Sequence, residues 1–155
     1  MRSGSSSRSA GAEPGRTRQT IEVDLKDPWQ GSLVQAGFDP RRPSGWLLEG
    51  FLFYIASERI THLLEEVDGL AAVGSWLGFD VVDSAVLTSP LTRPWVDMQA
   101  ASGTPWIGTM DDPQAFLASH GWKANLSQAG QADAKSSSKR GAGWPMTRCT
   151  QAWSP

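Results

Sequence analysis

The sequence predicts an α/β domain with a parallel sheet, and three observations indicate this fold class. Alternating or apolar runs that favour strands lie at residues 20–25, 46–48 and 75–82. Segments with helical spacing separate these runs, so the order is β-α-β-α-β. Such alternation is typical of parallel strands joined by right-handed crossovers. A length of 155 residues corresponds to about one domain.

Two helices are predicted between the strands. Asp27 suits the N-cap of the first helix, Pro28 its first helical position, and Gly37 its end. The second helix begins at Ser57, and its apolar residues between positions 60 and 67 recur at i, i+3, i+4 and i+7. That spacing predicts one apolar face, which we expect to pack against the sheet.

Residues 84–121 interrupt the alternation with four prolines and several aromatic residues. We expect two short helices there, at about 94–101 and 113–119, with Asp111 or Asp112 as the cap of the second. An irregular aromatic segment after a strand can roof a pocket. Alternatively, its rings simply anchor the segment to the sheet.

The two ends of the chain differ in composition from residues 20–128, the part expected to fold, whose last predicted strand covers residues 122–128. Residues 1–19 are rich in Ser, Gly and Arg, which predicts a disordered tail. Residues 129–155 are poor in aliphatic side chains, which predicts an irregular or disordered C-terminal tail. The arginines of the first tail could contact phosphate, but the net charge of -2 gives no basic field, so no nucleic-acid partner is expected.

Composition and spacing exclude several kinds of site. The single Cys149 rules out an internal disulfide, and His62 and His120 lack metal-ligand spacing, so we expect no metal site. No apolar run is long enough to span a bilayer, and the first residues lack the hydrophobic segment of a secretory signal. We therefore expect a cytoplasmic protein without a membrane partner. The Gly-rich phosphate loop, the P-loop and the G-x-S-x-G nucleophile motif are all absent.

Glu49 is the leading candidate site residue, because it interrupts the apolar run of residues 46–55. A carboxylate at that point needs either a partner or a function. Asp24 ends the first predicted strand, and the carboxyl ends of parallel strands share the edge at which open α/β sheets bind ligands. Both carboxylates could therefore face one crevice and accept hydrogen bonds from a nucleotide-like ligand. Acid–base chemistry by the pair, or a structural bond from Glu49 to loop amides, are the alternatives.

Residues 23–55, VDLKDPWQGSLVQAGFDPRRPSGWLLEGFLFYI, combine three motifs: D-L-x-x-x-W, G-F-D-x-x-x-P and W-x-x-E-G-x-x-x-Y. This combination resembles the S-adenosyl-L-methionine-dependent O-methyltransferases related to leucine carboxyl methyltransferases, and most of all a bacterial branch of them. The likeness continues through GSWLGFDVV and SPLTRPWVD to about residue 133.

The resemblance implies a partial class I methyltransferase (Rossmann-like) sheet that binds S-adenosyl-L-methionine at its carboxyl edge. It places Asp24 and Leu25 against the adenine, and Glu49 at the amino-acid end of the cofactor. The implied reaction is in-line attack on the methyl carbon by an oxygen of a small-molecule, hydroxyl or carboxyl acceptor. The candidates for the roof of the substrate pocket are Arg93, Trp95 and Trp106.

The sequence also departs from this family. A Gly-rich first loop, an acidic residue after the second strand and an Arg are expected upstream of Asp24, where only the Ser/Gly/Arg tail lies. The family's sheet order is 3-2-1-4-5-7-6, and we expect a sheet that lacks the first strands and the last one. Both ends suggest a truncated or frame-shifted product with little or no activity. The alternative is a non-catalytic remnant, or a module that binds proteins through exposed Trp residues.

Overall fold

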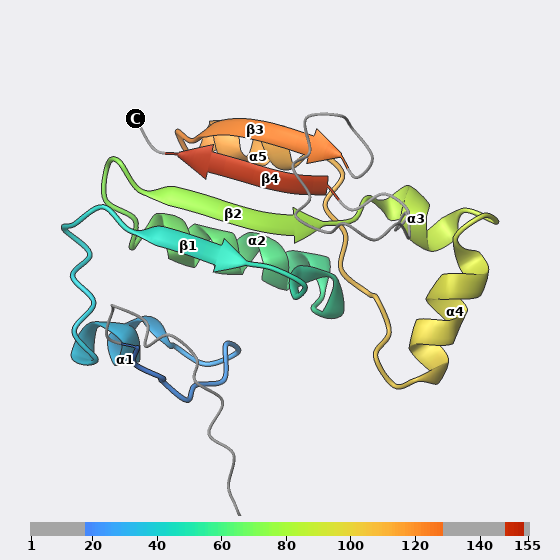
Figure 1. The fold of residues 1–155 in the computed structure, drawn as a ribbon, viewed down its shortest axis with the longest axis horizontal. Coiled ribbons are helices and arrows are strands. Elements are labelled where there is room, and N and C mark those ends of the chain that lie inside the picture. Colours follow the sequence, from blue (N-terminus) through green and yellow to red (C-terminus); the bar gives the residue numbers. More distant parts are fainter. Residues whose placement is uncertain (1–17, 129–147, 154–155) are drawn as a thin grey trace, which may run out of the picture. The chain divides into compact units, whose positions relative to one another are not determined.

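The structure is a computed structural model that describes residues 18–128 and 148–153. The predictions for residues 1–17, 129–147 and 154–155 lie outside the described residues. The chain divides into two compact units, Met1–Gly37 and Phe38–Pro155, and each is described by itself. Figure 1 shows the fold.

The first unit contains one short helix, α1, over Gln30–Gln35. Gly37, at φ 100°, follows its C-cap, so the predicted end is confirmed. The predicted start is wrong, because Trp29 is the N-cap and no side chain caps the helix. Asp27 is held elsewhere, since its N–H donates a 3.0 Å hydrogen bond to the Asp24 carbonyl oxygen in a turn.

The predicted strand at residues 20–25 is not formed in the structure. A strand exists through backbone hydrogen bonds to a neighbour, and no described strand pairs with this segment. The alternating residues of this segment favour a strand, but no described strand supplies the pairing that would complete it.

The second unit carries a four-stranded sheet in the order β1-β2-β4-β3. The strands are β1 (Gly45–Leu48), β2 (Trp76–Val81), β3 (Lys123–Gln128) and β4 (Arg148–Trp153). β1 and β2 are parallel, as the β-α-β pattern predicts, whereas β4 runs antiparallel to both β2 and β3 (Figure 1). The fold is therefore α/β, as expected.

β4 corrects two expectations, because it lies inside the predicted C-terminal tail and inside the sheet. All six of its residues pair with β2 on one side and with β3 on the other. The observed order is the 4-5-7-6 part of the family order, so the expectation that the last strand is missing is wrong for this sheet. Two flanking strands supply hydrogen-bond partners on both edges of β4, and local composition does not reveal such partners.

β1 forms where a strand is predicted from an apolar run, but the expectation from that run of a fully buried strand is wrong. Leu47 is 64% exposed, while its neighbours Trp46 and Leu48 are half-buried. A strand is buried on both faces only when helices cover both faces of its sheet. Helices α2 (Ser57–Asp68) and α5 (Pro113–Ser119) both lie behind the sheet in Figure 1, so one face of β1 is left exposed.

The core lies between the sheet and α2. The apolar stripe of this helix is buried as predicted, and so are the inward residues of β2. A short 3-10 helix, η1 (Leu52–Tyr54), follows β1 in the chain and adds two further buried side chains. These core residues are Leu52, Phe53, Ile60, Leu63, Leu64, Val67, Leu77, Phe79 and Val81.

Residues 84–121 form three helices, of which two were predicted. α4 (Arg93–Ala101) begins one residue before its predicted start, and α5 has its predicted bounds. Asp112 caps α5 by accepting a 2.9 Å hydrogen bond from the Ala115 N–H. α3 (Ser84–Thr88) was not predicted, although Asp83 caps it in the usual way. In the described part of the chain, no helix is long and apolar enough to cross a membrane.

Candidate functional site

Glu49 lies directly after the last residue of β1, at the carboxyl end of a parallel strand. It is exposed, and its side chain forms no hydrogen bond or ion pair with the other residues that the structure describes. The alternative of a structural bond from Glu49 to loop amides therefore finds no support among these residues. Its carboxylate is free to meet a ligand at the edge of the sheet.

Asp80, on the neighbouring strand, is the carboxylate that bonds to the loop amide. Its Oδ1 accepts a 2.8 Å hydrogen bond from the N–H of Gly50. The register pairs Leu48 with Phe79, so Glu49 and Asp80 follow at corresponding positions of the two strands. Two carboxylates thus come together at the carboxyl edge of the parallel pair, one exposed and one half-buried.

The electrostatics of this pair follow from burial. Loss of solvent raises the pKa of the Asp80 carboxyl above its ordinary value of 3.8, and the negative charge of Glu49 raises it further. Hydrogen bonds from the Gly50 N–H and from the N–H of Asp80 itself act in the opposite direction. Adjacent negative charges attract a cationic ligand group and repel phosphate. No group of three or more His, Cys, Asp or Glu side chains suited to a metal ion occurs among the described residues.

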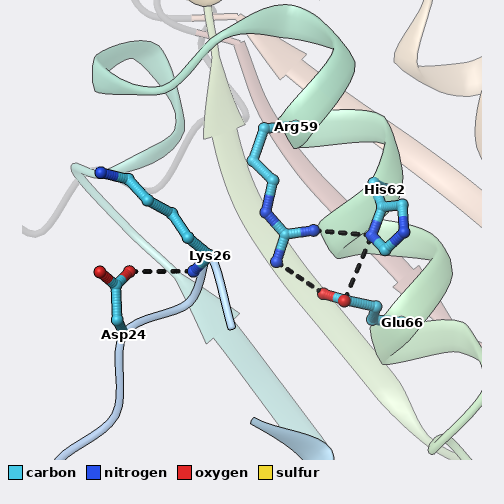
Figure 2. Close-up of polar contacts among 5 residues, drawn as sticks. All are labelled: Asp24, Lys26, Arg59, His62 and Glu66. Carbon is cyan, nitrogen blue, oxygen red and sulfur yellow. Dashed lines mark hydrogen bonds and ion pairs between the residues drawn. The ribbon is translucent and has the colours of Figure 1, made fainter. Parts of the chain in front are cut away.

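Asp24 carries a local structural bond in the first unit. Its Oδ1 accepts a 2.9 Å hydrogen bond from the backbone N–H of Lys26, as Figure 2 shows. Its neighbour Leu25 is half-buried. Asp24 and Glu49 belong to different compact units, so each is described by itself. That they face one crevice stays a prediction, and so do the cofactor contacts of Asp24 and Leu25.

The three roof candidates occupy different environments. Arg93 is exposed and donates a 2.8 Å hydrogen bond to Asp97, one turn further along α4. Trp95 and Trp106 meet edge to face with ring centroids 4.1 Å apart. Trp106 is also 4.1 Å from the ring of Phe53 and belongs to a buried cluster with Val82 and Val86. The two Trp rings thus anchor the segment, and their role in a pocket stays a prediction.

Trp106 also holds a buried N–H group that has no hydrogen-bond partner among the described residues. Of the other Trp side chains that the structure describes, Trp29 and Trp122 are buried and Trp46 and Trp95 are half-buried. Trp76 is 36% exposed. These side chains therefore give little support to a protein-binding surface made of exposed Trp residues.

A polar cluster on α2, consisting of Arg59, His62 and Glu66, was not predicted from the sequence (Figure 2). Arg59 donates hydrogen bonds of 2.6 Å to Nδ1 of His62 and 3.0 Å to Oε2 of Glu66. His62 Nδ1 is also 3.2 Å from Oε1 of Glu66. This nitrogen either accepts from Arg59 or, when it carries a hydrogen, donates to Glu66, and it cannot do both at once. Spacings of three, four and seven residues along one helix are the signal that could have revealed this cluster.

The contact of Asp80 could not be found from the sequence alone, because it depends on the strand register. The register places Asp80 beside the turn that follows β1, where it meets the Gly50 amide.

Comparison by sequence relates this chain to methyltransferases. Residues 6–68 match the leucine carboxyl methyltransferase family. A protein of Mycobacterium marinum, assigned by name to the S-adenosyl-L-methionine-dependent methyltransferases, is 36% identical over 132 residues, covering 77% of this chain and 43% of its own length. A protein of Streptomyces avermitilis with the same assignment is 34% identical over 110 residues, covering 70% of this chain and 38% of its own length.

One solved structure agrees with this chain in fold. A DUF574 family protein from Streptomyces avermitilis aligns with a TM-score of 0.64 at 16% identity, over 87% of this chain and 54% of that protein. At this identity the likeness concerns the fold alone. The chain spans about two fifths of the length of the curated relatives, between 38% and 43% for the two named above.

Proposed function

Because the chain belongs to the S-adenosyl-L-methionine-dependent methyltransferases related to leucine carboxyl methyltransferases, we propose that its carboxyl sheet edge forms part of a site for S-adenosyl-L-methionine. One observation carries the proposal. Glu49 is an exposed carboxylate, without a partner among the described residues, at the end of a parallel strand. That is the place where open α/β sheets bind ligands.

The charges of the site fit this cofactor. S-adenosyl-L-methionine carries positive charge on its sulfonium and its ammonium group, and the carboxylates of Glu49 and Asp80 lie at one edge of the sheet. At an exposed edge the attraction between opposite charges is modest, roughly 1 kcal/mol at 4 Å in water and more where water is excluded. Glu49 would therefore hold and orient the cationic end of the cofactor. Asp24 and Leu25 are proposed to contact the adenine, as the resemblance implies.

The reaction we propose is O-methyl transfer to a small-molecule hydroxyl or carboxyl group. The cofactor supplies the methyl group when it is bound. The residues of this chain would bind and orient the reactants, and orientation accounts for a large part of such rates. Arg93, Trp95 and Trp106 are proposed to shape the acceptor side. A cytoplasmic location stays a prediction of the sequence.

We propose further that this chain by itself has little or no transferase activity. β1 is an outer strand of the described sheet, and its Leu47 is 64% exposed. An open strand edge beside an exposed apolar residue is typical of a surface that other structure covers. A methyl-transfer assay on the purified chain tests this point separately from cofactor binding.

Calorimetric titration of the full chain with S-adenosyl-L-methionine tests the proposed function. Glu49→Ala is the decisive variant, and Glu65→Ala is the matched control. Glu65 is an exposed glutamate on α2 whose side chain forms no hydrogen bond or ion pair within the described part of the chain. Binding by wild type and by the control, together with loss in Glu49→Ala, is the expected result.

A further inference from the structure

We propose that Asp80 is a positioning residue for the cofactor site, because its carboxylate holds the Gly50 amide and thereby fixes the turn that presents Glu49. This inference rests on the proposed function, which assigns Glu49 to the cofactor. The placement of the Glu49 carboxylate then depends also on Asp80, which lies on the neighbouring strand.

The strand geometry explains why a side chain is needed at this point. β1 ends at Leu48, whereas β2 continues through Asp80 to Val81. β1 and β2 are therefore paired only as far as Leu48 and Phe79, and the chain leaves the ladder at Glu49. The Asp80 side chain reaches across this gap and accepts the N–H of Gly50 at 2.8 Å.

The turn is held on both sides of Gly50. Upstream, β1 is paired with β2. Downstream, η1 buries Leu52 and Phe53, which are 0% and 6% exposed. Gly50 itself adopts φ 65°, which side chains other than Gly rarely tolerate. The hydrogen bond to Asp80 fixes the middle of this short connection, so the backbone of Glu49 has little freedom to move.

The half-buried position of Asp80 adds weight to this role. A carboxylate loses solvation when it is buried, and burial raises the pKa of Asp80 accordingly. An Asn side chain would offer the same acceptor oxygen without that cost. The two residues can therefore be compared to separate the hydrogen bond from the charge.

The test compares Asp80→Ala with Asp80→Asn in the full chain, by calorimetric titration with S-adenosyl-L-methionine. Asp80→Ala removes the acceptor, and we expect it to weaken binding about tenfold or more, as the loss of a hydrogen bond to a charged group would. Asp80→Asn keeps an acceptor for the Gly50 N–H, and we expect binding within about threefold of wild type. Asp97→Ala is the control, because Asp97 is an exposed acid that pairs only with Arg93 among the described residues.

An effect of Asp80 on cofactor binding must be separated from an effect on the stability of the fold. Circular dichroism and thermal unfolding of each variant therefore accompany the titrations, and binding is compared between variants of equal stability. Asp80→Ala that folds and binds like wild type would overturn the inference. Asp80→Asn that binds as weakly as Asp80→Ala would also overturn it, since charge rather than the hydrogen bond would then matter.

Hydrogen exchange of the Gly50 amide keeps the inference testable if Asp80→Ala does not fold or if no variant binds. Protection of this amide in wild type and in Asp80→Asn supports the positioning contact. Exchange in folded wild type as fast as in an unstructured chain overturns it. Absence of binding by wild type with a protected Gly50 amide would contradict the proposed function and leave the Asp80–Gly50 contact supported.

Discussion

The backbone N–H of Gly50 donates a 2.8 Å hydrogen bond to Oδ1 of Asp80, and this bond joins the ends of two parallel strands. Asp80 lies within β2, while Gly50 lies two residues beyond the end of β1. The contact therefore links the sheet to the turn that carries Glu49. Asp80 is also half-buried, and this burial makes the stability of the chain depend on pH.

Asp80→Asn is expected to change the pH dependence of unfolding. Burial raises the pKa of the folded-state Asp80 carboxyl above its ordinary value of 3.8. The folded state therefore favours the protonated form of Asp80. The stability that this group contributes is fully present below pH 3.8, and it is lost as the pH rises through the raised pKa of the folded state. Asn cannot ionise, so the stability of the variant relative to wild type should rise from acid to neutral pH.

Urea unfolding of both proteins at several pH values between 3 and 7 measures this difference. Glu65→Gln, which changes an exposed acid on α2, provides the control for general charge effects. A difference between Asp80→Asn and wild type that stays constant across this range, or falls with rising pH, would contradict the assigned environment of Asp80.

Gly108→Ala is expected to destabilise the second unit. A Cβ atom at this position would overlap the carbonyl oxygen of Ile55 and would lie 2.7 Å from that of Leu52. Both are backbone atoms, which cannot move aside as a flexible side chain could. Overpacking of this kind typically costs about 1–3 kcal/mol, and thermal or urea unfolding would measure it.

Gly69→Ala is the matched control for that substitution. Gly69 follows α2 with helical backbone angles, and a Cβ there would meet no described atom closer than 3.6 Å. We expect this change to be neutral or to stabilise by about 0.4–1 kcal/mol, because Ala restricts the unfolded chain. Equal effects at the two glycines would show that the close approach at Gly108 is incorrect.

Asp112→Ala is expected to lower the free energy of unfolding by about 1 kcal/mol, the usual cost of losing an N-cap. Asp112 accepts a 2.9 Å hydrogen bond from the Ala115 N–H at the start of α5. Asp97→Ala should change stability by no more than about 0.5 kcal/mol, because its bond to Arg93 is exposed to solvent. If Asp97→Ala cost more than Asp112→Ala, the cap would not be the stronger contact.

Elements with a local signal were predictable from the sequence. The apolar stripe of α2 and the Asp-Pro start of α5 are encoded within single turns of helix, and both helices form where expected. The strand at residues 20–25 and the strand β4 were not predictable in this way. Whether a segment forms a strand depends on a neighbour elsewhere in the chain, which β4 has on both sides and residues 20–25 lack among the described strands.

The candidate site shows the same division. Glu49 was identified because a charge within an apolar run is anomalous by itself. The contact between Asp80 and Gly50 could not be identified, because it depends on the register of β1 against β2 and on where β1 ends. The relation of Asp24 to Glu49 is a further non-local property, and it stays a prediction.

The role of Glu49 in cofactor binding is tested by titration of the full chain with S-adenosyl-L-methionine, for wild type, Glu49→Ala and Glu65→Ala. We expect micromolar binding by wild type and by Glu65→Ala, and no detectable binding by Glu49→Ala. All three proteins should give the same circular dichroism, since the Glu49 side chain has no partner among the described residues. No heat from wild type at millimolar ligand, or equal binding by Glu49→Ala and wild type, would contradict this role of Glu49.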